Sequence, residues 1–150
     1  MTERVDFYVL QSAAPEQRWN FACRLAEKAY LRDLRVVILA ESAAAAEGLD
    51  DLLWTFSDAS FVPHALCTDD GAAADPAPVH LTADASRAPQ ADLLVNLSDR
   101  MPPDPARFAR IAEIVDADAE RRRLGRERFK SYRDMKIPLE THQPDDADET

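Results

Sequence analysis

The residues best suited to recognising a ligand lie in one basic stretch near the end of this sequence. Between positions 121 and 136, eight Arg or Lys residues stand against two acids, a local charge of +6. The whole chain of 150 residues carries −10, which leaves −16 on the remainder. Most of these cations are arginines, whose planar guanidinium groups bind carboxylates and phosphates through paired hydrogen bonds. This contrast predicts one dedicated site for an anionic partner.

The basic stretch has the spacing of a helix from about residue 118 to 135 or 136. At 100° per residue, Arg122, Arg126 and Arg133 share a narrow stripe, with Phe129 at its border. Such a stripe suits a peptide that ends in an aromatic residue and a carboxylate, preceded by acids. A solvated charged face is the alternative. The residues expected to face the sheet are Leu124, Tyr132 and Met135.

The motifs of enzymes and of cofactor sites are missing from the sequence. None of the three glycines follows an expected strand and opens a helix, so no phosphate-binding loop is formed. The three histidines are isolated from one another and from the cysteines, which argues against a metal site. No serine lies in a GxSxG elbow. We therefore expect no catalytic residues, no metal and no cofactor.

Length and composition are those of one cytoplasmic domain. Cys23 and Cys67 lie far apart in apolar stretches, which favours reduced, buried thiols. The N-terminus is charged and has no apolar signal segment, and no apolar run reaches the roughly 20 residues of a membrane helix. We expect one α/β domain over residues 1–142 and a disordered acidic tail over 143–150.

The first half of the chain alternates strands and helices. Apolar runs at 5–10 and 35–40 predict buried strands, the second one covered on both faces as in a parallel sheet. Pro15 suits the first turn of a helix that continues to about Arg32, and Ser42 is expected to cap a helix through Trp54. This order predicts an α/β fold with a mostly parallel sheet flanked by helices.

The second half predicts shorter elements. Strands are expected at 61–66, 79–81 and 93–97, separated by exposed loops at 68–78 and 82–91. Three prolines and Asp104 predict a short helix around 107–114, before the final basic helix.

Five stretches resemble the chi subunit family of bacterial DNA polymerase III. They occur in the family's order and cover most of the chain outside its loops. The blocks Leu-Trp…Phe-Val-Pro-His and Arg-Glu-Arg-aromatic-Lys-x-Tyr-Arg are the most specific. The stretches are Asp6-Phe7-Tyr8-Val9-Leu10, Ala22-Cys23-Arg24-Leu25-Ala26-Glu27-Lys28-Ala29-Tyr30, Leu49-Asp50-Asp51-Leu52-Leu53-Trp54, Phe61-Val62-Pro63-His64 and Arg126-Glu127-Arg128-Phe129-Lys130-Ser131-Tyr132-Arg133.

The resemblance implies a Rossmann-like, three-layer fold without a nucleotide-binding glycine loop, in a non-catalytic accessory subunit of the clamp-loader assembly. It also implies that the chain binds the acidic tail of single-stranded DNA-binding protein, which ends in Pro-Phe. The family's tail-binding residues carry over onto Arg122, Arg126 and Phe129, where Phe129 replaces a tyrosine, with Arg133 as a neighbour.

A second partner implied by the resemblance is the psi subunit, in hosts that have one. Its interface carries over onto Trp54, Phe61 and Val62, although Phe61 also suits a place in the core. Two other functions compete with this replication adaptor: a nucleic-acid-binding domain that uses the basic helix directly, and a nucleotide-dependent enzyme. The charge of the remaining surface disfavours the first, and the missing phosphate loop disfavours the second.

Overall fold

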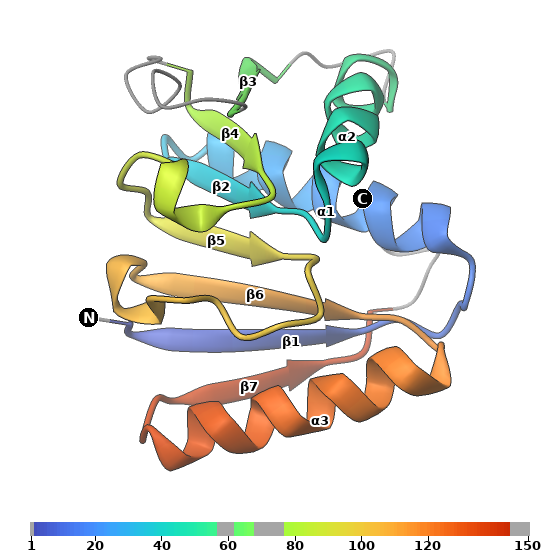
Figure 1. The fold of residues 1–150 in the computed structure, drawn as a ribbon, viewed down its shortest axis with the longest axis vertical. Coiled ribbons are helices and arrows are strands. Elements are labelled where there is room, and N and C mark those ends of the chain that lie inside the picture. Colours follow the sequence, from blue (N-terminus) through green and yellow to red (C-terminus); the bar gives the residue numbers. More distant parts are fainter. Residues whose placement is uncertain (1, 57–61, 68–76, 145–150) are drawn as a thin grey trace.

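The computed structural model describes residues 2–56, 62–67 and 77–144, in which seven strands form one parallel sheet. The strand order is β3-β4-β2-β5-β6-β1-β7 (Figure 1). The α/β class and the parallel sheet expected from the sequence are confirmed. The strands are β1 (Arg4–Val9), β2 (Val36–Leu39), β3 (His64–Leu66), β4 (Val79–Thr82), β5 (Leu93–Asn96), β6 (Arg110–Val115) and β7 (Leu139–His142), and the helices are α1 (Pro15–Tyr30), α2 (Ala43–Thr55) and α3 (Ala119–Asp134).

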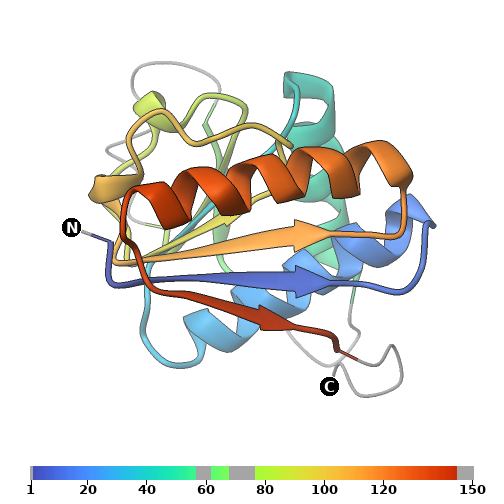
Figure 2. The ribbon, with the colours of Figure 1, turned by 90° about the horizontal axis from the view of Figure 1, so that it is seen from below.

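The helices cover the sheet from both sides and produce the three layers of a Rossmann-like fold. One core cluster joins α1 and α2 to the sheet, and a second contains Tyr132 of α3 with residues of the opposite face. Figure 2 shows the sheet between α1 and α3. Alternation along β1 divides its side chains between these faces: Phe7 belongs to the α3 side, whereas Asp6 and Tyr8 point to the α1 side.

Local signals explain the elements that the sequence predicted correctly. All four residues of β2 are buried, as expected for a central strand with an unbroken apolar run. Pro15 is the first residue of α1. The side chain of Ser42 caps α2 by accepting a hydrogen bond from the Ala45 amide at 3.1 Å.

The helix predicted around 107–114 is wrong, because this segment forms strand β6. The prolines produce only a short 3-10 turn over Pro105–Arg107, and the Asp104 side chain does not cap it. β6 lies between β5 and β1, and residues 111–115 are buried. A short apolar run fits a buried strand as well as a helix, and periodicity alone does not separate the two.

The chain also contains an edge strand that the sequence analysis missed. β7 pairs in parallel with β1, yet two of its four residues are exposed, so it carries little apolar signal. Met135 was expected to face the sheet and is instead 51% exposed, because it caps α3 where the chain turns toward β7. Within the described residues, no helix is long and apolar enough to cross a membrane. Residues 145–150 of the acidic tail lie outside the described part, as do most residues of the predicted loop 68–78.

Candidate functional site

A buried ion pair fixes α3 on the sheet. The Nε of Arg128 donates to Glu113 of β6 at 3.0 Å, and the other oxygen of this carboxylate accepts from the Tyr132 hydroxyl at 2.7 Å and from Asn96 at 2.9 Å. Glu113 and Arg128 are both buried. Burial raises the pKa of Glu113 above its ordinary value, against the opposing effect of Arg128 and the hydrogen bonds. The basic residue at the centre of α3 is therefore part of the core.

Beside this anchor, α3 and the sheet enclose a small hollow of about 230 Å³, which we call the α3 pocket. Gly125 brings the helix close to the strand, since a Cβ at this position would lie 3.0 Å from Val115 Cγ2. The rings of Phe129 and Phe7 contact each other, with centroids 5.3 Å apart. The pocket is lined by Phe7, Val9, Val115, Arg122, Gly125, Arg126, Phe129 and Thr141.

Three of the four residues predicted to bind a protein tail line this pocket together. Arg122 is held in place because its guanidinium donates to the carbonyl oxygens of Asp116 at 3.0 Å and Leu10 at 3.2 Å. Arg126 is exposed and forms no ion pair within the described part of the chain. Arg133 is exposed as well, but it does not line the pocket. The pocket thus combines an apolar floor with two rim guanidinium groups.

The other arginines of the basic stretch are committed to acids of this chain. Arg121 forms a two-point contact with the buried Asp116, at 2.9 and 2.8 Å. Arg123 pairs with Glu120 at 2.7 Å and also with Glu127. Burial raises the pKa of Asp116, but the hydrogen bonds from Arg121 and a backbone amide outweigh it and lower that pKa below its ordinary value. The free charge of α3 is consequently smaller than the sequence count suggests.

The residues predicted to face a psi subunit lie in different environments. Trp54 at the end of α2 is 55% exposed, and its ring centroid lies 4.7 Å from that of His64. The His64 Nε2 in turn lies 3.2 Å from Asp50 Oδ1. Val62 is completely buried in the core, so its side chain presents no surface to a partner. Phe61 lies outside the described residues. Of the two described residues, Trp54 is therefore the accessible one.

The carboxyl edge of the sheet, where parallel α/β proteins commonly bind ligands, is filled by the protein itself. The buried Arg18 of α1 donates to the carbonyl oxygens of Ile114 at 3.1 Å and Leu97 at 3.2 Å. It also pairs with Asp99 at 2.8 Å. The sequence analysis missed this role, although Arg18 lies four residues before Ala22, on the buried face of α1.

One cluster of described residues could present three ligand atoms to a metal ion. Asp6, Glu140 and His142 place such atoms within 4.8 Å of one another. Two arginines already neutralise this cluster: Arg110 lies 2.9 Å from Asp6, and Arg4 contacts Asp6 at 3.2 Å and Glu140 at 3.4 Å. Because the guanidinium groups supply the positive charge, the cluster is best explained as an ion-pair network between neighbouring strands.

Fold and site together define the class of this protein. It is a Rossmann-like α/β domain in which the side chain of Arg18 fills the carboxyl edge of the sheet, and in which arginines border a pocket beneath α3. A sequence model described as "DNA polymerase III chi subunit, HolC" matches residues 1–140. The chain belongs to this family, as the resemblance predicted.

Three curated relatives, each named DNA polymerase III subunit chi, support the assignment. The protein from Pseudomonas aeruginosa is 38% identical over 139 residues, which cover 93% of this chain and 95% of the relative. The protein from Haemophilus influenzae is 31% identical, with 89% and 92% covered. The protein from Escherichia coli is 29% identical, with 81% and 82% covered. The family is thus one of DNA polymerase III subunits, and its process is DNA replication.

Proposed function

We propose that this chain is a non-catalytic, chi-like accessory subunit of the DNA polymerase III clamp-loader assembly in the bacterial cytoplasm, close to the nucleoid. Its α3 pocket binds the acidic C-terminal tail of single-stranded DNA-binding protein. The observation that carries this proposal is the pocket itself, in which Arg122 and Arg126 flank an apolar hollow. A tail that ends in Pro-Phe offers a ring, a terminal carboxylate and upstream acids to these three features.

The dimensions and charges of the pocket support this occupant. Cavities of about 150 Å³ accommodate benzene, so a hollow of about 230 Å³ has room for one phenyl ring. Phe129 and Phe7 supply an aromatic wall for ring packing. Arg126 is free to pair with the carboxylate, while Arg122 is already oriented by two backbone carbonyl groups. Arg133 then attracts the upstream acids from outside the pocket.

The decisive experiment measures the affinity of a fluorescent tail peptide by anisotropy. Arg126→Ala should weaken binding by about ten-fold or more, because charge-assisted hydrogen bonds contribute roughly 1.5–3 kcal/mol each. Arg126→Glu should weaken it further, and rising salt should weaken the wild-type complex. Lys28→Ala, on the opposite face of the sheet, is the control and should change little. Wild-type affinity in a folded Arg126→Glu variant would refute the proposal.

Direct binding of nucleic acid by α3 is the alternative function. Arg121, Arg123 and Arg128 are paired with acids, which reduces the charge available to a phosphate backbone. The same anisotropy assay with a single-stranded oligonucleotide separates the two. Loss of oligonucleotide binding in Arg126→Glu, with the peptide unaffected, would favour this alternative.

We also propose that the surface around Trp54 binds the psi subunit in hosts that have one. Phe61 is expected to take part, while the buried Val62 supports the surface from within the core. An anchoring aromatic residue commonly contributes roughly 2 kcal/mol or more. Trp54→Ala should therefore weaken psi binding in calorimetric titration and leave tail-peptide affinity unchanged. A combined loss of both activities and of melting temperature would mean that Trp54 only stabilises the fold.

A further inference from the structure

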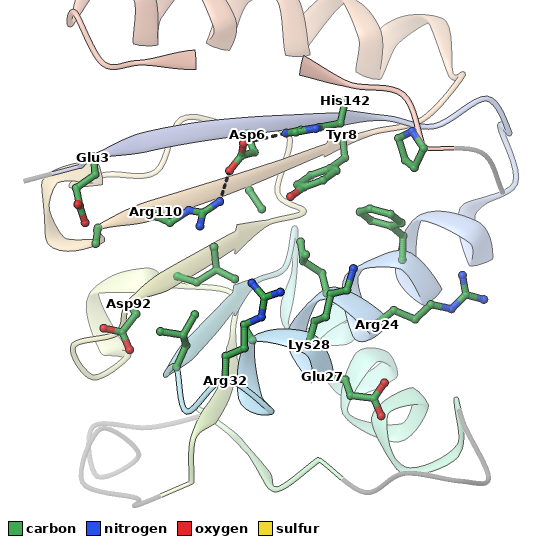
Figure 3. Close-up of a pocket in the computed structure, with 18 of the residues that line it drawn as sticks. Glu3, Asp6, Tyr8, Arg24, Glu27, Lys28, Arg32, Asp92, Arg110 and His142 are labelled. Atoms are coloured by element: carbon green, nitrogen blue, oxygen red, sulfur yellow. Dashed lines mark hydrogen bonds and ion pairs between the residues drawn. The ribbon is translucent and has the colours of Figure 1, made fainter. Parts of the chain in front are cut away.

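The face of the sheet opposite α3 carries a much larger hollow, which we call the α1 groove. It has a volume of about 1090 Å³ and lies between α1 and strands β1, β5, β6 and β7 (Figure 3). Because side chains alternate along a strand, it receives Asp6 and Tyr8 of β1, whereas their neighbour Phe7 lines the α3 pocket. The groove is therefore a separate site. Its apolar lining includes Phe21, Leu25, Leu34, Phe56 and Leu93.

One wall of the α1 groove presents a row of free cations. Arg24 and Lys28 belong to α1, and Arg32 follows in the turn after it, so the three are spaced by four residues. Figure 3 shows Lys28 and Arg32 extending into the hollow, which Glu27 of the same helix also lines. Within the described residues, none of the three cations forms an ion pair. Among the lining residues of α1 and its following turn, these three cations outnumber the single acid Glu27, so this wall keeps an excess of positive charge.

The acid at the centre of the opposite wall, Asp6, is already paired. Asp6 is engaged by Arg110 and by His142, each at 2.9 Å (Figure 3). Burial raises the pKa of Asp6, but the hydrogen bonds from Arg110 and His142 outweigh it and lower that pKa below its ordinary value. The His142 ring is stacked on Tyr8, with centroids 4.8 Å apart. The charge of Asp6 is thus balanced within this wall, opposite the cations of α1.

Acidic residues lie at one end of the groove and restrict the kind of anion that fits. Glu3 and Asp92 line the groove on the side away from Arg24 (Figure 3). A continuous phosphate backbone along the groove would run into these carboxylates. A peptide with acids over only part of its length avoids them and also fills the apolar lining. Charge and shape therefore favour a peptide over a nucleic acid.

We propose that the α1 groove binds a short segment of a partner protein that combines acidic residues with large apolar ones. The acids pair with Lys28, Arg32 and Arg24, and the apolar side chains cover the lining. The chain's own residues 145–150, Asp-Asp-Ala-Asp-Glu-Thr, match only half of this requirement, because they contain acids but no large apolar side chain. Pro144 lines the groove and directly precedes these residues, so a chain that ends at Pro144 serves as an additional variant in the test.

The test is a selection from a random peptide library displayed on phage. Peptides are kept if they bind the wild-type chain and are removed if they bind the Lys28→Glu/Arg32→Glu variant. The matched control, Lys130→Glu/Lys136→Glu, makes the same change in net charge with two exposed lysines outside the groove. Circular dichroism and urea unfolding establish that both variants are folded. The selected peptides are then synthesised and their affinities measured by calorimetry.

We expect selected peptides that contain acids next to leucine or aromatic residues. Their affinity should fall by about ten-fold or more in Lys28→Glu/Arg32→Glu, as for the loss of about 1.4 kcal/mol, and should be retained in the matched control. Arg126→Glu should leave it unchanged, which separates this proposal from the one for the α3 pocket. Removing residues 145–150 should strengthen binding only slightly.

Several outcomes would overturn the proposal. If no peptide distinguishes the wild-type chain from the double variant, the groove is not a peptide site. Selection of acids without apolar residues would show attraction by charge alone. Binding that occurs only after residues 145–150 are removed would show that the chain fills its own groove. If the wild-type chain binds a single-stranded oligonucleotide or forms a dimer, and the double variant does not, the groove has a different occupant.

Discussion

The two basic surfaces of this protein differ in size and in how firmly their cations are held. The α3 pocket of about 230 Å³ has one guanidinium group fixed by backbone carbonyls. The α1 groove of about 1090 Å³ has three long cations, of which Lys28 and Arg32 are exposed and Arg24 is half-buried. A preorganised site loses less conformational entropy when it binds, and its shape selects its ligand. We infer that the α3 pocket suits one defined chain end and that the α1 groove tolerates more varied sequences.

The helices beside these two surfaces, α1 and α3, are each anchored to the sheet by a buried arginine. The two anchors differ in how many partners each arginine has. Arg128 of α3 depends on one buried carboxylate, that of Glu113, and its two terminal nitrogens have no hydrogen-bond partner within the described residues. Arg18 of α1 contacts Asp99 and, in addition, two backbone carbonyl oxygens. The attachment of α3 should therefore be more sensitive to the loss of a single acid than the attachment of α1.

The largest expected effect tests this difference in anchoring. Glu113→Ala should lower the free energy of unfolding by about 3–5 kcal/mol, because it leaves a buried guanidinium without its counter-ion. Asp99→Ala should cost less, since Arg18 keeps both carbonyl partners. Urea unfolding of the two variants provides the measurement. Equal losses in both would show that the two anchors are equivalent.

The next effect tests whether the two surfaces are independent. Arg126→Glu should weaken only the tail peptide, and Lys28→Glu only a peptide selected for the α1 groove, by about ten-fold or more each. In the variant with both changes, each peptide should lose as much binding free energy as in the single variant that affects it, because the sites lie on opposite faces of the sheet. Titration of both peptides against the three variants tests this. A clear departure from additivity would mean that the surfaces are coupled through the sheet.

A smaller effect concerns acid stability on the α1 side. The pKa of Asp6 lies below its ordinary value of 3.8. As the pH falls, the unfolded chain therefore binds a proton at Asp6 at a higher pH than the folded chain does. The stability that Asp6 provides is complete above pH 3.8 and is lost as the pH falls through its folded pKa. Asp6→Asn should flatten the decrease in urea midpoint below about pH 4. An unchanged pH profile would contradict this assignment.

The smallest effect is expected from an exposed arginine of α3. Arg123 pairs with Glu120 and Glu127 on the solvent side of the helix and does not line the α3 pocket. Arg123→Ala should leave both the melting temperature and the tail-peptide affinity unchanged, because solvent screens exposed ion pairs. A marked loss of tail binding would show that the tail extends along the outer face of α3.

Much of the fold follows from local patterns in the sequence. The apolar run of β2, the Ser42 cap and the helical spacing of α3 each identify their element correctly. β6 and β7 could not be identified in this way. β6 contains Glu113, whose charge is compensated by a residue 15 positions later, and β7 gains its structure by pairing with β1 at the other end of the chain.

The candidate site shows the same division. Helical periodicity alone placed Arg122, Arg126 and Phe129 near one another, since a regular helix fixes the angle between its residues. Only the tertiary structure separated these residues from Arg128, which the sequence counts as an equal member of the basic stretch. Whether an arginine is free or buried depends on acids brought to it from distant segments. Arg18 and Asp99 are 81 residues apart, and no local pattern encodes that contact.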